Sequence, residues 1–311
     1  MNLIDFHCDT IYKVLKDNSN LLNNSYHVDI NKLIKSNSIA QFFAMCVNLY
    51  ESKDPLQDCL LMVDRFHTEL EKNKDKINLA TNYNEIMNNK KENKISAFLT
   101  IEEGGILKGK LENLRIFKKL GVSLITLTWN FPNEIGYPNY NWVHADKGLT
   151  PFGLELISEM NDKKMIIDVS HLSDAGFYDV ARYSKSPFIA SHSNAREIEP
   201  NERNLTDEMI KVLAEKGSLL GINFYGLFLN GSAESRIDDI VKHITHIKQV
   251  GGIDIISLGT DFDGINSNLE LKNIGKMDLL VQALKKDHFT EKEIEKIFYK
   301  NALRFIKDVT L

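Results

Sequence analysis

The sequence has few cysteines, no long hydrophobic run and no excess of positive charge. Only three cysteines occur in 311 residues, and Cys8, Cys46 and Cys59 have no C-x-x-C spacing, which argues against a disulfide framework or a structural zinc knuckle. This usage favours a reducing compartment. No segment approaches the ~18 consecutive apolar residues of a membrane span, and the first residues lack the basic region and apolar run of a signal peptide. We therefore expect a cytoplasmic protein without membrane contacts.

The charge balance also excludes classes of partner. The 38 basic and 43 acidic side chains leave a formal net charge of −5, and no basic stripe is present, so nucleic acid is not an expected partner. The phosphate-binding signature G-x-G-x-x-G does not follow the first strand-like run, and G-x-x-x-x-G-K-[ST] occurs nowhere. These absences argue against the common nucleotide-binding folds.

Short apolar runs alternate with segments of helical period along the chain. Near-continuous runs of this kind are typical of strands buried on both faces of a parallel sheet. They cover residues 3–7, 39–49, 95–101, 122–129, 165–170, 187–191, 218–224 and 255–260, with helices predicted at 56–73, 111–121, 150–162, 172–184, 205–217 and 235–252. This count favours a single (β/α)8 barrel domain over residues 1–311, and a doubly wound open sheet is the alternative.

Local signals mark the ends of several predicted helices. Thr150, Ser173 and Thr206 stand at N-cap positions, and glycines at 121, 217 and 251 follow the last turns. The segment 130–148 is too long for an ordinary loop and carries prolines and aromatic residues. We expect it to form an ordered cover over a functional site.

Polar side chains of the metal-binding type end several of the predicted strands. In a barrel the carboxyl ends of the strands meet at the active site. The residues at these ends are His7 and Asp9, Glu102 and Glu103, Asp168 and His171, His192, and Asp261 and Asp263. Imidazole and carboxylate ligands together suit zinc, and the set exceeds what one tetrahedral ion uses. Two metal ions bridged by a carboxylate would account for the whole set of ligands.

Each of these residues also has an ordinary structural explanation. His7 and Asp9 could form a hydrogen-bonded pair, and Glu102 and Glu103 precede two glycines and could belong to a solvated turn. Asp168 could orient a histidine without binding metal itself. The coincidence of all these positions at one end of the strands favours the metal site.

The remaining histidines and the cysteines do not stand among other potential metal ligands at strand ends. Helical or helix-flanking segments contain His27, His67, His243, His246 and His288, for which we expect structural roles, whereas His144 in the long segment stays open. We expect packing roles for the cysteines; Cys8, between His7 and Asp9, faces away from both.

A series of motifs runs through the whole chain in a specific order. They are DFHCDT (5–10), FLTIEEGG (98–105), LITLTWN (124–130), LTPFG (149–153), IDVSHLSD (167–174), SHSNAR (191–196) with RNL (203–205), and GTDFDG (259–264). This series resembles the membrane (renal) dipeptidase family of binuclear zinc peptidases, which are (β/α)8 barrels related to the amidohydrolases. The resemblance extends essentially from end to end.

The resemblance implies which residues bind each metal ion. His7 and Asp9 would bind one zinc and His171 and His192 the other, with Glu102 as the bridge; Glu103 remains an alternative for the bridge. A water between the two ions would be made nucleophilic near neutral pH and would attack the peptide carbonyl as hydroxide.

The resemblance also implies roles for residues around the metals. Arg203 would grip the substrate carboxylate, a task suited to a guanidinium fork. Asp261 would contact the substrate and carry the proton from the water to the leaving amine. Trp129 stands where the animal members have a substrate-binding histidine, and an indole can donate a hydrogen bond but cannot take up a charge. The implied activity is hydrolysis of dipeptides with a free C-terminal carboxylate.

Two other functions stay open at this point. One is a related binuclear amidohydrolase that acts on N-acyl amino acids or lactones, and the other is a metal-binding barrel without catalysis. The choice of dipeptides, acceptance of D-residues and the metals present in vivo are not readable from the sequence. The family implies a homodimer, although disulfide-linked dimers have no support in this sequence.

Overall fold

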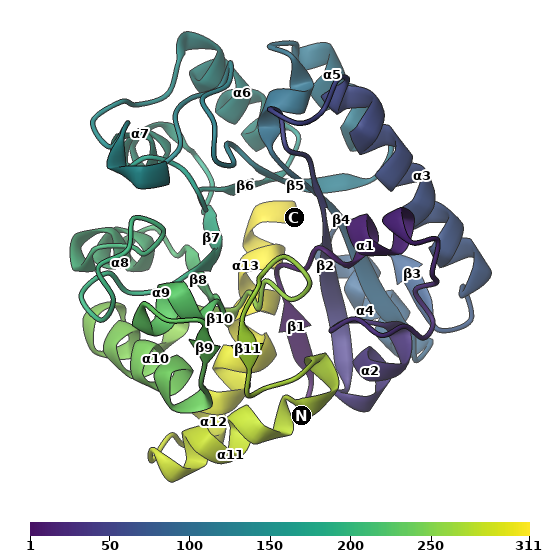
Figure 1. Cartoon of the computed structure of the whole chain (residues 1–311), viewed down its shortest axis with the longest axis vertical. Helices are drawn as coiled ribbons and strands as arrows, with labels where there is room; N and C mark the ends of the chain where they lie inside the picture. Colours follow the sequence, from purple (N-terminus) through teal and green to yellow (C-terminus); the bar gives the residue numbers. More distant parts are fainter.

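Eight parallel strands close into a barrel in the computed structural model, which describes residues 1–311 (Figure 1). In order around the barrel they are β1 (Leu3–Asp5), β2 (Ser38–Cys46), β4 (Ile95–Glu102), β5 (Val122–Thr126), β6 (Ile166–Asp168), β7 (Ile189–Ser193), β8 (Leu219–Ile222) and β10 (Ile256–Leu258). Pairing of β1 with β10 and of β2 with β4 completes the ring. The predicted (β/α)8 barrel is confirmed, and the open doubly wound sheet is excluded.

Each predicted helix is present between the strands. The helices are α3 (Pro55–Lys72), α5 (Leu111–Lys119), α6 (Pro151–Asp162), α7 (Asp174–Tyr183), α8 (Asp207–Glu215) and α10 (Ile237–Gly251). Thr150, Ser173 and Thr206 cap α6, α7 and α8 by accepting hydrogen bonds from backbone N–H groups of the first turn. One detail differs from the prediction. Gly251 is still helical, and Gly252, with φ of 83°, ends α10.

Several elements have no counterpart among the predicted ones. The helices of this group are α1 (Thr10–Lys16), α2 (Ile30–Lys35), α4 (Tyr83–Lys91), α9 (Gly226–Asn230), α11 (Asp278–Lys286), α12 (Glu291–Glu295) and α13 (Asn301–Thr310), with a π-helical turn at Lys296–Lys300. Strand β3 (Ile77–Leu79) pairs with the start of β4 outside the ring, and β9 (Glu234–Ser235) pairs with β11 (Asn268–Leu269). None of the helices combines the length and the apolar composition needed to cross a membrane.

The barrel interior is filled by aromatic side chains and closed at one end by α13. The rings of Phe6 and Phe42 lie 4.5 Å apart, Phe42 stacks on Phe98 at 4.3 Å, and Phe305 of α13 meets Phe6 edge-on at 6.1 Å. All four are fully buried, and each such side chain contributes about 1.5–3 kcal/mol by burial. Figure 1 shows α13 within the ring of strands.

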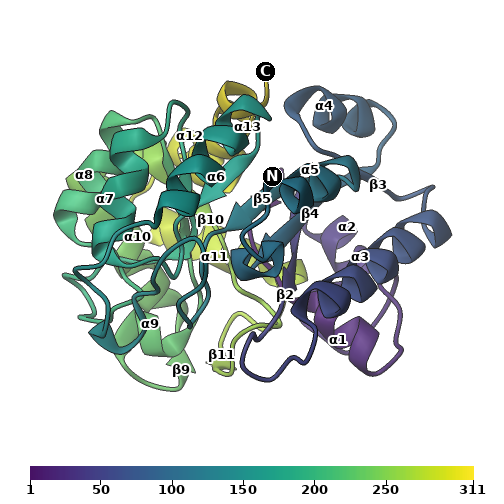
Figure 2. The same cartoon turned by 90° about the horizontal axis from the view of Figure 1, so that it is seen from above.

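The two ends of the barrel therefore differ in composition. Figure 2 shows α4 and α13 at one end and β9, β11 and α9 at the other. The strands begin at the end of the barrel that contains α13. There, Ile4, Phe42 and Leu219 belong to the same buried cluster as Phe305. Polar side chains are left to the opposite end, where the strands finish.

Candidate active site

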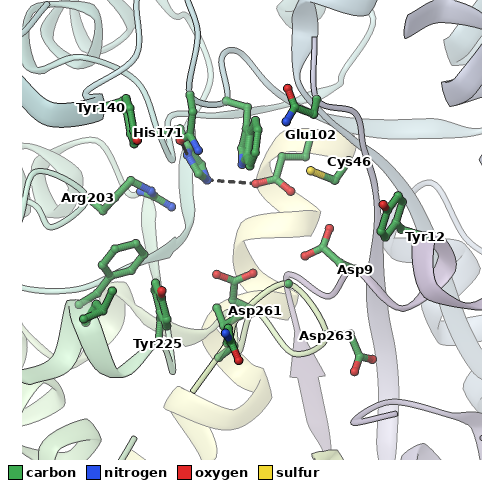
Figure 3. A pocket seen from close by; sticks show the side chains of 18 of the residues that line it. Asp9, Tyr12, Cys46, Glu102, Tyr140, His171, Arg203, Tyr225, Asp261 and Asp263 are labelled. Atoms are coloured by element: carbon green, nitrogen blue, oxygen red, sulfur yellow. Dashed lines mark hydrogen bonds and ion pairs between the residues drawn. The ribbon is translucent and has the colours of Figure 1, made fainter. Parts of the chain in front are cut away.

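A cluster of buried polar side chains lies at the carboxyl ends of the strands (Figure 3). The predicted site residues it brings together are His7 and Asp9 after β1, Glu102 at the end of β4, His171 after β6, His192 in β7, Arg203 in the loop after β7, and Asp261 after β10. All of them are at most 9% exposed. Residues up to 254 positions apart in the chain thus meet because the strands that carry them are neighbours in one ring.

Glu102 occupies the centre of this cluster. Its Oε2 lies 3.2 Å from Nε2 of His7, while its Oε1 lies 3.0 Å from Nε2 of His171 and 3.4 Å from Nε2 of His192. Asp9 Oδ2 is 3.4 Å from the same nitrogen of His7. The two carboxylate oxygens of Glu102 therefore contact different histidines, as a bridging ligand requires, and the rings of His7 and His192 lie next to each other with centroids 3.9 Å apart.

The cluster has the properties of a metal centre. Asp9 Oδ1 is buried and has no hydrogen-bond partner, which is costly for a polar atom unless another ligand satisfies it. Groups of three potential ligands, among them His7, Glu102 and His192, have their ligand atoms within 4.8 Å of one another. Imidazole and carboxylate donors at this density suit zinc and related divalent ions. The residues present fit the group that the sequence predicted.

The charges in the cluster depend strongly on one another. Burial lowers the pKa of His7, but the carboxylates of Glu102 and Asp9 outweigh it and raise this pKa. Burial would raise the pKa of Glu102, but His7, His171 and His192 lower it well below its usual value. Burial, with the charge of Arg203, lowers the pKa of His171 to about 4. An ionised Glu102 and a neutral His171 are the forms that bind metal.

Asp261 differs from Glu102 in its surroundings. Burial raises its pKa to about 8, and the negative charges of Asp9 and Glu102 act in the same direction, against the effect of His7. The side chain accepts a hydrogen bond of 2.8 Å from Asn223 Nδ2. Its backbone has a φ of 59°, a conformation that non-glycine residues seldom adopt and that is often found at functional sites.

Gly264, the last residue of the GTDFDG motif, allows the tight packing around Asp261. A Cβ on Gly264 would lie 2.1 Å from Asp9 Oδ2 and 2.6 Å from Asp261 Oδ1. Any side chain at this position would displace the carboxylates of the cluster. The motif therefore provides the carboxylate of Asp261 and, through the missing side chain of Gly264, the space for it.

Two histidines of the cluster are oriented by side chains behind them. Asp168 accepts hydrogen bonds from Thr126 Oγ1 and Ser191 Oγ, each 2.6 Å long, and Ser191 Oγ lies 2.7 Å from His192 Nδ1. His171 Nδ1 lies 3.1 Å from Asn130 Oδ1. The prediction of an orienting role for Asp168 is consistent with these contacts. Such partners fix the ring and the nitrogen that a metal would use.

Some of these residues are absent from the candidates that the sequence offered. Ser191, Asn223 and Asn130 contact site residues, yet serine and asparagine are common at strand ends and in turns. The only signal was their position within the SHSNAR and LITLTWN motifs or beside a strand end. Asn223, directly after β8, had no motif to mark it.

Glu103 has a different role from its neighbour. Its carboxylate accepts hydrogen bonds from the backbone N–H groups of Gly105 (2.7 Å) and Trp129 (3.1 Å) and from the side chain of Asn133 (2.5 Å). It caps the short 3-10 helix Gly104–Leu107 from a backbone with φ of 100°. These contacts tie the end of β4 to the segment after β5, and they leave Glu102 as the residue at the centre of the cluster.

Asp263, the second aspartate of GTDFDG, also faces away from the ligand cluster. It accepts hydrogen bonds from Thr10 Oγ1 at 2.6 Å and from the backbone N–H of His27 at 2.8 Å. Burial would raise its pKa, but the hydrogen bonds from His27 and Thr10 lower it. Asp263 thus fastens the segment between α1 and α2 to the loop after β10.

Arg203 is buried beside the cluster with incomplete hydrogen bonding. Its Nη1 lies 3.4 Å from Ser193 Oγ and its Nη2 donates to the backbone oxygen of His192 at 3.2 Å. The Nε atom has no partner, although the residue is only 4% exposed. The guanidinium stacks over the ring of Phe228, 5.2 Å from its centroid. A buried cation with unused donors is suited to an anionic group of a ligand.

A cavity of about 820 Å³ opens above these residues. Arg203, Asp261 and Glu102 line it, together with Trp129 and Tyr140. Trp129 directly precedes the long segment 130–148, and Tyr140 belongs to it. The segment contains the short 3-10 helix Tyr140–Trp142 and an isolated bridge from Pro138 to Leu172. The ring centroid of Trp129 lies 6.3 Å from that of His171. The segment that was expected to cover a functional site thus contributes Asn130 and Tyr140 to the wall of the cavity.

The other histidines contribute nothing to the cluster. His243 is fully buried, where its Nδ1 accepts from the backbone N–H of Ala195 at 3.1 Å and its Nε2 lies 2.9 Å from the oxygen of Leu229. His246, three residues later, pairs with Asp207 at 2.7 Å. The structural roles predicted for both are those observed.

The expectation for the cysteines is only partly correct. Cys8 and Cys59 are fully buried in the apolar core. Cys46 instead lines the cavity, because it ends β2 at the same level at which Glu102 ends β4. A thiol at a strand end gives no sequence signal that separates it from a packing cysteine.

The barrel and the buried histidine and carboxylate cluster at its carboxyl end define a metal-dependent hydrolase. The chain belongs to the membrane dipeptidase family, peptidase family M19, whose model matches residues 1–311. It is therefore a metallo-dipeptidase. The resemblance read from the motifs is confirmed.

Similar proteins come from several organisms. An uncharacterized dipeptidase of Schizosaccharomyces pombe is 35% identical over 224 residues, which are 70% of this chain and 54% of that protein. Dipeptidase tcpJ of Claviceps purpurea is 26% identical over 316 residues, covering 98% of this chain and 73% of its own length. A metallo peptidase from Rhodobacter sphaeroides, solved with a phosphinate mimic of the dipeptide L-Ala-D-Ala, has a TM-score of 0.92 and 22% identity, with 99% of each chain covered. The last likeness concerns the fold.

Proposed function

We propose that this protein hydrolyses dipeptides that carry a free C-terminal carboxylate and that it uses two zinc ions. The observation that carries the proposal is the position of Glu102 between two groups of ligands, with the buried cation of Arg203 beside them. A two-metal site next to a carboxylate-binding group fits a short peptide whose scissile bond lies close to its C-terminus. The size of the cavity suits a small substrate.

The residues that would hold the two ions follow from the geometry of Glu102. His7 and Asp9 lie on the side of Oε2, and His171 and His192 lie on the side of Oε1. When bound, zinc ions supply electrophilic activation of a peptide carbonyl and make water more acidic. The protein's own part is to hold ligands in their metal-binding forms and to keep bulk water from the cluster.

Arg203 would orient the substrate. Its guanidinium has an unpartnered Nε and weak contacts at 3.2 and 3.4 Å, so donors are free for a carboxylate. Burial lowers the pKa of Arg203, and the negative charge of Asp261 opposes this effect, so the side chain keeps its charge. A bidentate contact would fix the C-terminal residue and bring its peptide bond to the cluster.

Asp261 would move the proton. Its carboxylate lies 3.8 Å from His7 Nε2 and lines the cavity, with Asn223 holding one oxygen in place. Burial raises the pKa of this carboxyl group above its usual value. In its ionised form, Asp261 would accept a proton from water and return it to the leaving amine. Divalent cations nearby would shift this pKa downward.

Trp129 would contact the substrate beside His171. Its indole can donate one hydrogen bond and offers an apolar face, but it cannot carry a positive charge. With a tryptophan at this position, we expect the pocket to bind the substrate here by packing and not by a charge.

The names of related proteins also support a dipeptide substrate. The relative from Schizosaccharomyces pombe is named a dipeptidase, and the structure from Rhodobacter sphaeroides contains a mimic of L-Ala-D-Ala. A panel for this protein should therefore contain L-Ala-L-Ala and L-Ala-D-Ala, with an N-acyl amino acid and a lactone for comparison.

The test combines metal analysis with this panel. We expect about two zinc ions per chain, hydrolysis of dipeptides, loss of hydrolysis on chelation and its return when zinc is added. Undiminished dipeptide hydrolysis by protein shown to be free of metal would contradict the proposal, as would a preference for the lactone or the N-acyl amino acid.

A further inference from the structure

Cys46 places a thiol beside the proposed metal ligands. It is the last residue of β2 and pairs in register with Glu102, the last residue of β4. The Sγ atom of Cys46 and one carboxylate oxygen each of Asp9 and Glu102 lie within 4.8 Å of one another. Figure 3 shows the thiol on the same side of the cavity as these two carboxylates.

A second observation favours a cation beside Asp9 and Cys46. Asp9 is only 6% exposed, and its Oδ1 has no hydrogen-bond partner. A buried carboxylate oxygen normally finds a donor or a positive charge, because leaving it bare costs about 1–3 kcal/mol or more. No lysine or arginine forms an ion pair with Asp9 or Glu102; their charged partners are histidines. A divalent ion bound by Asp9 and Glu102 would supply the missing positive charge and lie close to the thiol of Cys46.

We propose that Cys46 is a ligand of the metal ion held by Asp9 and Glu102. This inference rests on the proposed function, because it adds a thiolate to the ligands named there. Coordination replaces the S–H bond by a metal–sulfur bond and releases the proton to solvent. No oxidant or other reagent takes part.

The consequence is a preference for thiophilic metals. Thiolate ligands favour Zn²⁺, Co²⁺ and Cd²⁺, whereas purely oxygen-rich sites also accept Mn²⁺ and Mg²⁺. If Cys46 coordinates the ion bound by Asp9, this position would favour soft metals over hard metals of the same charge. Among the groups of possible metal ligands, a sulfur atom occurs only in that of Asp9, Cys46 and Glu102.

The chain contains a matched control for this thiol. Cys59 lies in α3, is fully buried among apolar side chains and belongs to none of the groups of possible metal ligands. Cys8 is also buried, and its Sγ donates to the backbone oxygen of Phe42 at 3.5 Å. A thiolate signal from a bound metal should therefore depend on Cys46 alone.

The experiment uses cobalt as a spectroscopic probe. The full-length protein is loaded with Co²⁺, and the near-ultraviolet sulfur-to-cobalt charge-transfer band is recorded. We expect the band in the wild type and in Cys59→Ala and its absence in Cys46→Ser and Cys46→Ala, each of which should keep the circular dichroism of the native fold. A band that persists in both Cys46 variants, or a wild type that binds cobalt without any such band, would overturn the inference.

A competition experiment measures the selectivity directly. Replacement of Cys46 by serine should lower the preference for Cd²⁺ over Mn²⁺ by about tenfold or more, while Cys59→Ala leaves it unchanged. Two bound ions, metal-dependent hydrolysis and no thiolate band would refute the role of Cys46 and leave the proposed function standing. A protein that binds no divalent metal would refute both.

Discussion

The carboxylate of Glu102 faces His171 with Oε1 at 3.0 Å and turns its second oxygen to the opposite side of the cluster. Its neighbour in sequence, Glu103, makes only backbone and asparagine contacts. Two adjacent glutamates thus have separate tasks, because consecutive residues at the end of a strand point in different directions.

Replacement of Glu102 by glutamine should remove metal. An amide cannot supply two anionic oxygens, so the content should fall from about two ions per chain to about one or fewer, as measured by elemental analysis. Glu103→Gln is the control. It should keep both ions and lower the free energy of unfolding by about 1–3 kcal/mol, because buried backbone donors lose part of their acceptor. Full metal content in Glu102→Gln would contradict the bridging role.

Ser191→Ala should weaken one ion only. Ser191 connects Asp168 to His192 through contacts of 2.6 and 2.7 Å. Loss of such an orienting partner typically costs about 10–100-fold in metal affinity. A titration with a chelator should show one ion released more easily and the other retained as in the wild type. Equal weakening of both ions would argue against a specific effect on His192.

Asp261→Asn should separate proton transfer from metal binding. We expect kcat to fall by about 10²- to 10⁴-fold, the usual contribution of a positioned acid or base, while two ions remain bound. The side chain is held by Asn223 at 2.8 Å, so the amide should fit without rearrangement of the loop. Wild-type turnover by this variant would remove Asp261 from the mechanism.

The buried His243 should make stability depend on pH. Burial lowers its pKa to about 4, although the contact of Nε2 with the backbone oxygen of Leu229 acts in the opposite direction. The neutral ring accepts a hydrogen bond from the backbone N–H of Ala195. The unfolded chain takes up a proton first, so this stability is present above the unfolded pKa of about 6.5 and is lost as the pH falls toward 4. Between pH 7 and pH 5 the loss should be about 2 kcal/mol.

Urea denaturation of His243→Gln at these two pH values tests this expectation. The variant should lose less free energy of unfolding on acidification than the wild type, by about 2 kcal/mol. His246→Gln, on the same helix, should behave like the wild type. The same pH dependence in all three proteins would show that other groups cause it.

The fold and the ligands of the cluster could be predicted because their signals are local. Strands buried on both faces are continuous apolar runs, and His7 and His192 stand at the ends of such runs within specific motifs. The helix α13 was not predicted, because its position at the end of the barrel depends on a contact between Phe305 and Phe6, which are far apart in the sequence. Its amphipathic pattern alone does not state which surface it covers.

The supporting residues were harder to predict for a related reason. Ser191 acts through Asp168, 23 positions away, and Asn223 acts on Asp261, 38 positions away. Such contacts depend on the register of neighbouring strands, which the sequence pattern does not fix. The same holds for Cys46, whose importance comes from the strand beside it. The cellular location and the dimeric state stay predictions.

The role of Arg203 gives the most direct test of the proposed activity. The measurement is kcat/KM of the metal-loaded protein for L-Ala-L-Ala and for the same dipeptide with an amidated C-terminus. Loss of a charged partner for a buried guanidinium costs about 2–5 kcal/mol, so hydrolysis of the amide should be slower by about 10²-fold or more. Equal values for the two substrates would contradict recognition of a free carboxylate by Arg203 and with it the assignment as a dipeptidase of this specificity.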